Sequence, residues 1–203
     1  MIIALTAEKE FASEIQIIHG LFEQGLDRLH LRKYHFTDEQ MCHYVASIDA
    51  TYHDRLVLHS HPQLSNALHI HNIHLNEHHR QSGLFNQQLT TCSCSTSVHH
   101  ISQFNDLDKR WKYAFFSPFF SSISKTGYGQ HDTVLDQLKQ RSNFDVQLIG
   151  LGGIKAENCL LSLRTGANGI ALLGALWQNS HPIQHFITCK QICSKEYSIS
   201  HKD

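Results

Sequence analysis

The stretch VQLIGLGGI, from Val146 to Ile154, is a strand-like apolar run that ends in paired glycines. A helical stretch follows it, and then a second apolar run, GANGIALLGALW, from Gly166 to Trp177. A buried strand, a tight glycine turn, a helix and a second strand are typical of the closing quarter of a phosphate-binding (β/α)8 barrel. Such a barrel binds anions at the loops after its seventh and eighth strands, where backbone N–H groups meet the phosphate. The stretch therefore predicts a protein that binds a phosphorylated small molecule.

The rest of the chain alternates strand-like and helical segments. Strand-like runs lie at Ile2 to Thr6, Arg28 to Arg32, Arg55 to His59, Ile73 to Asn76, Thr90 to Ser95, Tyr113 to Ser117, Val146 to Leu151 and Gly169 to Leu173. Apolar residues recur at helical spacing in Phe11 to Phe22, Asp38 to Ile48, Val98 to Phe104, Thr133 to Gln140, Glu157 to Thr165 and His181 to Cys193. Eight strands close a barrel of this kind, and no linker or low-complexity tract divides the chain. We therefore expect one α/β domain, a single TIM barrel over residues 1–203.

The composition argues against several classes of protein. Lys and Arg total 17 and Asp and Glu total 18, so no basic field is present to attract nucleic acid. No segment approaches the length of a membrane span, and the apolar run at the N-terminus is brief. We expect a soluble, cytoplasmic protein that binds small phosphorylated molecules, with neither nucleic acid nor membrane as a partner. The sequence leaves a homo-oligomer open.

Cysteine and histidine are the residues that raise the question of a metal. The six cysteines have no paired zinc-ribbon spacing, so we expect reduced thiols in the core or lining a site. The chain has 18 histidines, seven of them between His59 and His79. Imidazole is a common metal ligand, but ligands have to converge in space and several of these would alternate faces of a strand. Surface and core histidines are the favoured interpretation, and metal binding by residues 59–79 stays open.

Five motifs recur in order over nearly the whole chain. They are LHLRK (Leu29 to Lys33), LVLHSHPQLSNALHIHNIHLNE (Leu56 to Glu77), FFSPFFSSISKTGYG (Phe115 to Gly129), LIGLGGI (Leu148 to Ile154) and GANGIALLGALW. Together they resemble thiamine-phosphate synthase and its relative, thiazole tautomerase. For the synthase, the resemblance implies that a (β/α)8 barrel joins 4-amino-2-methyl-5-hydroxymethylpyrimidine diphosphate to thiazole phosphate. Pyrophosphate is released with the help of Mg²⁺.

The resemblance also implies a set of catalytic and anion-binding residues. Arg32 matches an arginine that grips the diphosphate, and a planar guanidinium suits two phosphate oxygens at once. Ser122, Ser124 and Lys125 match the hydroxyls and the lysine of the loop after strand six, which hold phosphate or pyrophosphate. An ammonium there would stabilise charge on the departing pyrophosphate. His30 takes the place of a glutamine of the synthase, and tautomerase-like relatives also have a histidine there.

Further substrate contacts are implied at the later strands. Gly152 and Gly153 would let the thiazole phosphate approach the backbone, and Leu173 and Gly174 would add amides from strand eight. His74 matches a histidine on the family's fourth strand. These residues are expected to bind substrate, although turn geometry alone would also require the glycines.

The departures from the family bear on its metal. The synthase has an Asn-Asp pair after strand three and another aspartate after strand four, which support magnesium. An ungapped reading places His59 and Ser60 at the pair and His79 at the later aspartate. Mg²⁺ prefers hard oxygen ligands, whereas a serine and a histidine, Ser60 and His79, stand at its expected positions. The sequence therefore leaves open whether Mg²⁺ is the cofactor. Glu77 could substitute only after a shift of register. The lysine that follows the family's arginine aligns with Tyr34.

The fifth strand carries the residue that separates synthase from tautomerase. The family's serine corresponds to Ser95 or, in another register, to Cys94, and we take Ser95 as a catalytic residue. The tautomerase has an acid/base histidine slightly later, which moves the thiazole double bond. Thr96 stands at that position, and His99 is the nearest replacement.

Three hypotheses remain. The first is a divergent thiamine-phosphate synthase. The second is an isomerase of the thiazole tautomerase type, and the third is a non-catalytic protein that binds thiazole phosphate or thiamine phosphate. We take the first on motif coverage, because fold alone cannot choose among the chemistries that barrels host.

Overall fold

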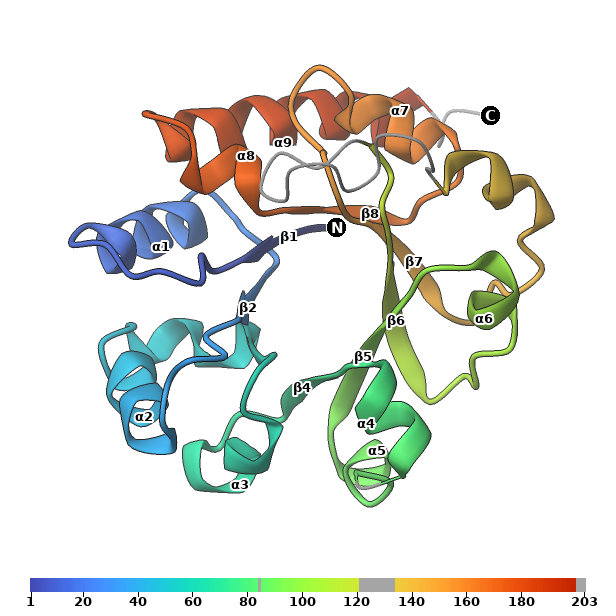
Figure 1. The fold of residues 1–203 in the computed structure, drawn as a ribbon. Coiled ribbons are helices and arrows are strands. Elements are labelled where there is room, and N and C mark those ends of the chain that lie inside the picture. Colours follow the sequence, from blue (N-terminus) through green and yellow to red (C-terminus); the bar gives the residue numbers. More distant parts are fainter. Residues whose placement is uncertain (84, 121–133, 200–203) are drawn as a thin grey trace.

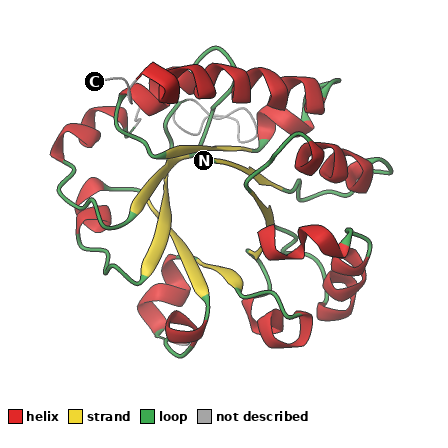
Figure 2. Ribbon diagram, turned by 180° about the vertical axis from the view of Figure 1, so that it is seen from behind, coloured by secondary structure: helices red, strands yellow, loops and turns green. Residues whose placement is uncertain are grey.

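Eight parallel strands close into a barrel in the computed structural model, which describes residues 1–83, 85–120 and 134–199 (Figure 1). Each strand pairs with the next along the chain, and β8 pairs with β1 to complete the ring. Helices lie between successive strands and surround the ring, as Figure 2 shows from behind. The predicted (β/α)8 barrel is confirmed.

The elements have the following bounds. The strands are β1 (Ile2–Leu5), β2 (Arg28–Leu31), β3 (Leu56–Leu58), β4 (Asn72–Leu75), β5 (Ser93–Val98), β6 (Trp111–Phe116), β7 (Gln147–Gly150) and β8 (Gly169–Leu172). The α-helices are α1 (Glu14–Glu23), α2 (Asp38–Ala46), α3 (Ser65–Leu68), α4 (Glu77–Ser82), α5 (Gln88–Thr91), α6 (Ile101–Asn105), α7 (Cys159–Arg164), α8 (Gly174–Trp177) and α9 (Pro182–Ile199). Three 3₁₀ helices are η1 (Ala50–Arg55), η2 (Pro62–Leu64) and η3 (Leu135–Gln140). Within the described ranges, no helix is both long and apolar enough to cross a membrane.

The fifth strand begins later than the sequence predicts. The predicted run Thr90 to Ser95 is wrong in its bounds, because the strand covers Ser93–Val98 and the threonines before it end α5. β-branched residues favour strands, but the N–H of Cys92 donates to the carbonyl of Gln88 at 2.8 Å and closes a helical turn there. The shift adds Ser97 to the strand, two residues after Ser95 and on the same face.

Two predicted helices also differ from the structure. The helix expected from Val98 to Phe104 begins only at Ile101, because β5 continues through Val98. The helix expected from Thr133 to Gln140 is η3 instead, in which N–H groups bond three residues back, as Gln137 does to Val134 at 3.1 Å. Residue 133 lies outside the described residues.

The main hydrophobic core lies between the outer face of the barrel and the helices. On β2, Leu29 and Leu31 point outward into this core, while His30 between them points into the barrel. A second, smaller cluster fills part of the interior and consists of Ile3, Leu5, Tyr113, Phe115, Ile149 and Ala171. All six cysteines are free thiols, four of them buried. The interior also contains Val57 on β3 and buried polar side chains, among them His30, His74 and Ser95, whereas branched apolar side chains usually fill such a barrel.

A buried ion pair fixes the turn after β2. Lys33 donates from Nζ to both carboxylate oxygens of Glu14, at 2.9 and 2.8 Å. The two side chains are 0% and 2% exposed, and the Lys33 ammonium also lies 5.1 Å from the ring centroid of Tyr44 on α2. Burial raises the pKa of Glu14, and Lys33 opposes that shift. Lys33 therefore joins β2 to α1 and α2 outside the barrel.

Removing one partner of this pair should destabilise the fold more than removing both. We expect Lys33→Met to lower the free energy of unfolding by about 3 kcal/mol or more, because it leaves the Glu14 carboxylate buried without a partner. The double variant Lys33→Met with Glu14→Leu should recover most of that loss. Urea unfolding measures both.

The control for this comparison is an exposed ion pair. Arg110 donates to Asp108 at 2.9 Å, and both side chains are more than half exposed. Arg110→Ala should cost less than about 1 kcal/mol, as surface pairs do. Equal stability of wild type and Lys33→Met would contradict the prediction.

Candidate active site

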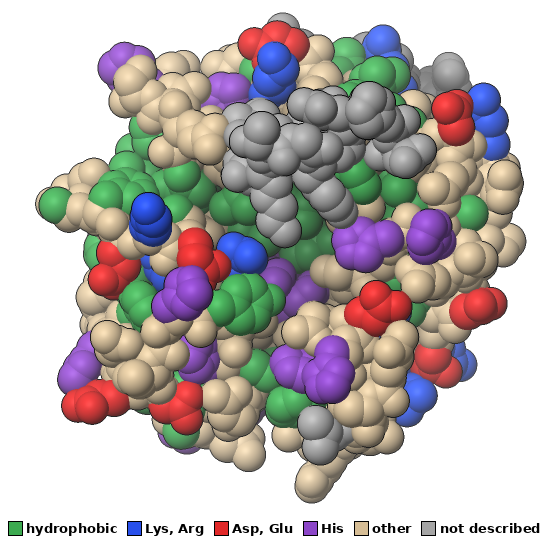
Figure 3. Space-filling view, viewed as in Figure 1, with side chains coloured by type: hydrophobic (Ala, Val, Ile, Leu, Met, Phe, Trp, Pro, Cys, Tyr) green, Lys and Arg blue, Asp and Glu red, His purple; other side chains and the backbone are tan. Residues whose placement is uncertain are grey.

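A cavity of about 790 Å³ opens at the carboxyl ends of the strands. Figure 3 shows a hollow near the centre of this face, with histidine side chains inside it. Its volume is in the usual range for a small-molecule site, and (β/α)8 barrels place their active sites at this end. One side of the cavity is apolar and is lined by Leu5, Phe11, Leu151, Ile154, Leu173 and Trp177. The other side is polar and is lined by Glu8, Arg32, Tyr34, His59, His74, Asn76, Glu77, Ser97 and His99.

Arg32 lies on the polar side, directly after β2. Its guanidinium donates to Glu8 at 2.8 Å and lies 5.0 Å from the ring centroid of Tyr34, and its side chain is 24% exposed. Its backbone N–H donates to Thr6 Oγ1 at 2.8 Å, which fixes the strand end. The neighbouring Lys33 points the opposite way. Arg32 is therefore held in the cavity, where an anionic ligand would compete with Glu8 for its N–H groups.

The loops after β7 and β8 bring backbone to the cavity. Gly152 and Gly153 have φ values of +99° and +64°. A Cβ on Gly152 would lie 3.1 Å from Pro118 Cα, so the residue has to be glycine. Among the residues that the structure describes, no loop, turn or cap hydrogen bond uses the N–H groups of Gly153, Leu173 or Gly174. These amides are donors that an anion in the cavity could use.

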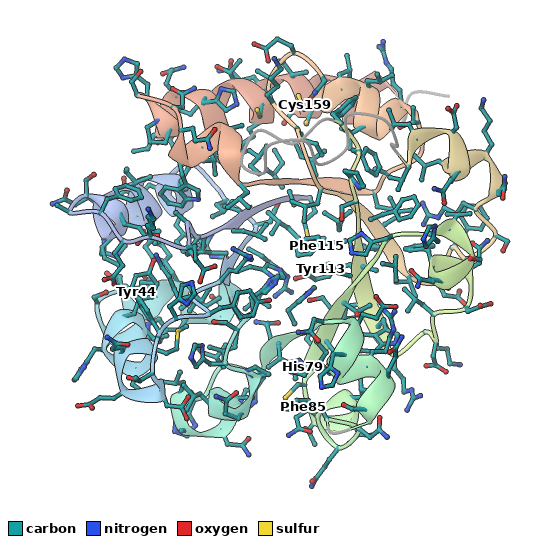
Figure 4. All side chains as sticks on the ribbon, in the orientation of Figure 1. Tyr44, His79, Phe85, Tyr113, Phe115 and Cys159 are labelled. Carbon is teal, nitrogen blue, oxygen red and sulfur yellow. The ribbon has the colours of Figure 1, made fainter. Side chains whose placement is uncertain are left out.

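His30 and His59 meet at the base of the cavity. Their Nδ1 atoms are 3.0 Å apart, so one of the two nitrogens carries the proton and the other accepts it. The other nitrogen of His30, Nε2, lies 2.6 Å from the hydroxyl of Tyr113 on β6. Figure 4 labels Tyr113 and Phe115, whose side chains lie near the centre of the barrel. His59 lines the cavity, whereas His30 is fully buried below it.

His74 lies beside His59. The two rings are stacked, with centroids 4.0 Å apart and an interplanar angle of 14°. His74 Nδ1 lies 2.9 Å from Ser95 Oγ, and Nε2 lies 3.0 Å from Ser97 Oγ. Both ring nitrogens of His74 therefore have partners on β5. Ser95 is buried under His74, while Ser97 lines the cavity.

All three histidines are neutral at pH 7. Burial lowers the pKa of His30 and of His59 well below the ordinary value, and neighbouring imidazoles lower it further. Burial, with contributions from His79 and Arg80, lowers the pKa of His74 to about 3. Each ring thus offers one N–H and one lone pair.

The trio His30, His59 and His74 could hold a metal ion, because one ligand atom from each lies within 4.8 Å of the others. Imidazole ligands suit zinc and similar transition metals rather than magnesium. Such an ion would have to replace existing hydrogen bonds, since both ring nitrogens of His30 and of His74 have protein partners.

The structure brings together most of the residues expected from the sequence. The cavity is lined by Arg32, His59, His74, Gly152, Gly153, Leu173 and Gly174. His30 and Ser95 lie directly beneath it, in contact with His59 and His74. Ser122, Ser124 and Lys125 lie outside the described residues. The tautomerase position, Thr96, does not reach the cavity, because its hydroxyl donates to the carbonyl of Leu75 on the other face of the strand.

Some residues of the site were missed. Glu8 pairs with Arg32, Tyr113 bonds to His30, and Ser97 bonds to His74. Tyr113 could have been found from the alternation of β6, on which it shares a face with Phe115. Ser97 was missed because the predicted strand ended at Ser95. Nothing in the sequence beyond a charge after β1 indicates Glu8.

The fold and the cavity define a (β/α)8-barrel protein with a preformed small-molecule site. A family model described as thiamine monophosphate synthase matches residues 2–176. The chain therefore belongs to the thiamine monophosphate synthase family.

Individual relatives agree with this assignment. The chain is 27% identical over 169 residues to a thiamine-phosphate synthase of Streptococcus suis (strain 98HAH33), covering 79% of this chain and 68% of that protein. A thiamine phosphate pyrophosphorylase structure from Bacteroides thetaiotaomicron is similar with a TM-score of 0.73 and 26% identity, covering 96% of this chain and 98% of that one. The Pyrococcus furiosus enzyme of the same name has a TM-score of 0.79 at 14% identity, covering 96% and 95%, and shows the fold alone.

The family generally depends on Mg²⁺, but the residues at its expected positions do not fit that ion. Ser60 Oγ accepts the N–H of Lys33 at 3.1 Å and lies 2.7 Å from His61 Nδ1, outside the cavity lining. His79 packs against Phe85 with ring centroids 4.9 Å apart, away from the cavity (Figure 4). A serine hydroxyl and an imidazole also lack the carboxylate oxygens that Mg²⁺ prefers.

Two carboxylates do line the cavity within the described part of the chain, and both have other partners. Glu8 accepts from Arg32, as described above. Glu77 Oε1 accepts from Gln103 at 3.1 Å and from Gln81 at 3.2 Å. Both carboxylates of the described polar side are therefore engaged by neighbouring side chains.

The neutral histidines make stability depend on pH. In the unfolded chain their pKa is about 6.5, whereas the pKa of folded His74 is about 3. Between these values the unfolded state binds more protons, so stability is full above about pH 6.5 and falls as the pH falls. We expect His74 alone to contribute a loss of about 1.4 kcal/mol per pH unit in this window.

Urea unfolding between pH 7 and 5, in buffers with EDTA, measures this slope. His74→Asn should flatten it, because asparagine can bond to the serines without titrating. His35 is exposed, so His35→Asn is the matched control and should leave the slope unchanged. An identical slope for wild type and His74→Asn would show that His74 is not held neutral in the fold.

Proposed function

We propose that this chain joins 4-amino-2-methyl-5-hydroxymethylpyrimidine diphosphate to thiazole phosphate and releases pyrophosphate, forming thiamine phosphate. Family membership supports this reaction class. The observation that carries the proposal is that Arg32 and the loops after β7 and β8 line one cavity, which gives it two candidate anion-binding regions. Arg32 lies on the polar side. The N–H groups of Gly153, Leu173 and Gly174, which make no loop, turn or cap hydrogen bond among the described residues, lie at the ends of β7 and β8. Two phosphorylated substrates need two such regions.

The diphosphate would bind at Arg32. The C–O bond between the pyrimidine methylene and the diphosphate breaks, and the electron pair leaves with pyrophosphate. The guanidinium of Arg32 stabilises the charge that develops on the leaving group. Lys125, Ser122 and Ser124 are proposed from the sequence to add donors from the loop after β6.

The thiazole phosphate would bind with its phosphate at the loops of Gly153 and Gly174. Its ring nitrogen then forms the new C–N bond with the pyrimidine methylene carbon. The apolar side of the cavity, which includes Trp177 and Ile154, packs against the rings and keeps water from the electron-poor carbon. Neutral His59 and His74 present no positive charge that would oppose its formation.

Ser95 and His30 act in this proposal as positioning residues. Each is buried and touches a histidine of the cavity wall, at 2.9 Å for Ser95 with His74 and 3.0 Å for His30 with His59. No step is assigned to Mg²⁺, because its expected positions do not reach the cavity. The substrates are phosphorylated metabolites, and we propose a cytoplasmic location on that ground. A homo-oligomer stays a prediction.

A second candidate function is isomerisation of a thiazole-type ring without a metal. The specific observation that favours it is the set of neutral, hydrogen-bonded histidines at the base of the cavity. The resemblance of the sequence to thiazole tautomerase motivates this alternative, although the sequence comparison aligns Thr96 with the acid/base histidine of that family.

Product formation from the two substrates, with and without Mg²⁺ and followed by mass, tests the first function. Thiamine phosphate should form. We expect Arg32→Ala and Lys125→Ala each to lower kcat/KM by about 100-fold or more, because each removes charge stabilisation from the leaving group.

Arg110→Ala is the matched control and should keep wild-type turnover, since Arg110 lies before β6 at the opposite end of the barrel. Unchanged turnover in both Arg32→Ala and Lys125→Ala would rule out the assignment. Binding of thiazole phosphate, seen as a raised Tm, without turnover would favour a binding protein.

A further inference from the structure

The hydroxyl of Tyr113 begins a short series of hydrogen bonds that ends at the cavity. Tyr113 is 4% exposed, and the hydrogen bonds of the described residues give its hydroxyl one partner, His30 Nε2, at 2.6 Å. Burial raises the pKa of Tyr113 to about 12, so the hydroxyl keeps its proton. A buried O–H needs an acceptor. Tyr113 therefore donates to His30 Nε2, and this nitrogen has the lone pair.

The proton of His30 is then on its other nitrogen. Burial holds the pKa of His30 well below its ordinary value, so the ring is neutral and has one N–H and one lone pair. Because Nε2 is the acceptor, His30 Nδ1–H donates to His59 Nδ1 across 3.0 Å. Burial keeps His59 neutral as well. His59 therefore carries its proton on Nε2.

This Nε2–H group of His59 is accessible from the cavity. His59 lines the cavity, and its Nδ1 is directed at His30, which is fully buried beneath it. Within the described part of the chain, no hydrogen bond engages His59 Nε2, and this atom is not among the buried side-chain atoms that lack a partner. His59 thus presents a neutral hydrogen-bond donor that a bound ligand can reach.

His74, whose ring is stacked against His59, presents no such donor. Ser95 donates from its hydroxyl to the carbonyl of Ile73 at 3.3 Å, so the Ser95 oxygen accepts from His74 Nδ1–H at 2.9 Å. His74 Nε2 then has the lone pair and accepts from the Ser97 hydroxyl at 3.0 Å. The two stacked rings have opposite tautomers, and of the two only His59 offers an N–H to a ligand.

The His59 donor lies beside Arg32. The backbone N–H of His59 donates to the carbonyl of Leu31 at 3.2 Å, so His59 and Arg32 follow the ends of neighbouring strands. The ring of Tyr34 lies near both side chains, with its centroid 5.0 Å from the guanidinium carbon of Arg32 and 6.1 Å from the centroid of the His59 ring. One charged and one neutral donor are thus available to the same anion on the polar side of the cavity.

We propose that His59 is a further catalytic residue, which donates from Nε2–H to an oxygen of the diphosphate that Arg32 binds. Tyr113 and His30 are the positioning residues that keep the proton on that nitrogen. This inference rests on the proposed synthase function and extends its anion site.

The hydrogen bond from His59 strengthens as the reaction proceeds. The C–O bond breaks, the electron pair leaves with pyrophosphate, and the negative charge on the leaving oxygens grows. The proton stays on His59 throughout. A neutral donor stabilises the leaving group without placing a positive charge near the electron-poor carbon.

Inorganic pyrophosphate, titrated by calorimetry in a buffer with EDTA, probes this donor directly. His59→Met removes the N–H and keeps a side chain of similar size, whereas His59→Gln retains an amide N–H. We expect pyrophosphate to bind His59→Met about 10-fold or more weakly than wild type, because a hydrogen bond to a charged group is lost. His59→Gln should recover most of this affinity. His181 is exposed and outside the cavity lining, so His181→Met is the matched control and should bind as wild type does.

Turnover separates binding from catalysis. We expect kcat for thiamine phosphate formation to fall by about 10- to 100-fold in His59→Met, because the lost hydrogen bond is stronger to the departing pyrophosphate than to the bound substrate. KM for the pyrimidine diphosphate should change less than kcat. His59→Gln should restore most of the turnover.

The tautomer of His59 gives a readout that does not depend on activity. Long-range ¹H–¹⁵N spectra of histidine-labelled wild type should show a neutral His59 ring protonated on Nε2, with its signals identified by their absence from His59→Gln. Tyr113→Phe removes the O–H that fixes this tautomer, so His30 can carry its proton on Nε2 and accept from His59 Nδ1–H. We expect both tautomers of His59 in this variant, together with weaker pyrophosphate binding.

Tyr44→Phe is the matched control for the tyrosine. Tyr44 is buried on α2 outside the barrel, so its loss should leave the His59 tautomer unchanged. A wild-type His59 ring protonated on Nδ1 would overturn the inference, even if Tyr113→Phe failed to fold.

The outcomes distinguish this inference from the function on which it rests. Thiamine phosphate formation with equal kcat/KM in wild type and His59→Met would overturn the inference alone. Pyrophosphate binding that depends on His59, without thiamine phosphate formation, would overturn the proposed function and the catalytic role of His59 and leave an anion site. Pyrophosphate that binds only with Mg²⁺, and equally well to wild type and His59→Met, would overturn the role of His59 as a donor.

Discussion

A polar side chain inside a closed barrel has to find its hydrogen-bond partner on another strand. This constraint determines which polar side chains form hydrogen bonds in the interior between β2 and β6. His30 on β2 reaches Tyr113 on β6 at 2.6 Å, and that contact spans the barrel between strands that are not neighbours. An imidazole left without a partner there would carry the cost of an unmet hydrogen bond, on the order of 1–3 kcal/mol. Pairings of this kind also hold His59, through His30, and His74, through Ser95 and Ser97, at the floor of the cavity, so stability and site geometry have one cause.

At the end of β2, two adjacent residues have different roles: one stabilises the fold and the other lines the cavity. Arg32 and Lys33 are adjacent cations, yet the alternation of the strand sends them to opposite sides. Lys33 enters an apolar layer and is stable there only because Glu14 meets it at 2.8 Å. Arg32 stays at the rim of the cavity, where Glu8 and the ring of Tyr34 hold it without burying it. The ion pair outside the barrel thus orients the backbone that presents the arginine inside it.

Much of this could be predicted from the sequence, and the failures have physical reasons. Apolar runs and paired glycines were enough for eight strands and for the loop at Gly152 and Gly153, because burial and positive φ leave a local signature. The start of β5 was not predictable from propensity, since its threonines are β-branched but close a helical turn. Because the predicted strand ended at Ser95, Ser97 was not recognised as a residue of the site. The pairing of His30 with Tyr113 had no local signal at all, because 83 residues separate the two partners and only closure of the barrel brings them together.

The interior also limits the kind of chemistry the cavity can support. Burial keeps His30, His59 and His74 uncharged, and the positions that would carry magnesium ligands in the family lie outside the cavity as Ser60 and His79. What remains on the described polar side is one arginine for an anion and neutral imidazoles that can donate or accept hydrogen bonds. Charge stabilisation at Arg32 suits departure of a phosphorylated leaving group, which is the reaction that we propose.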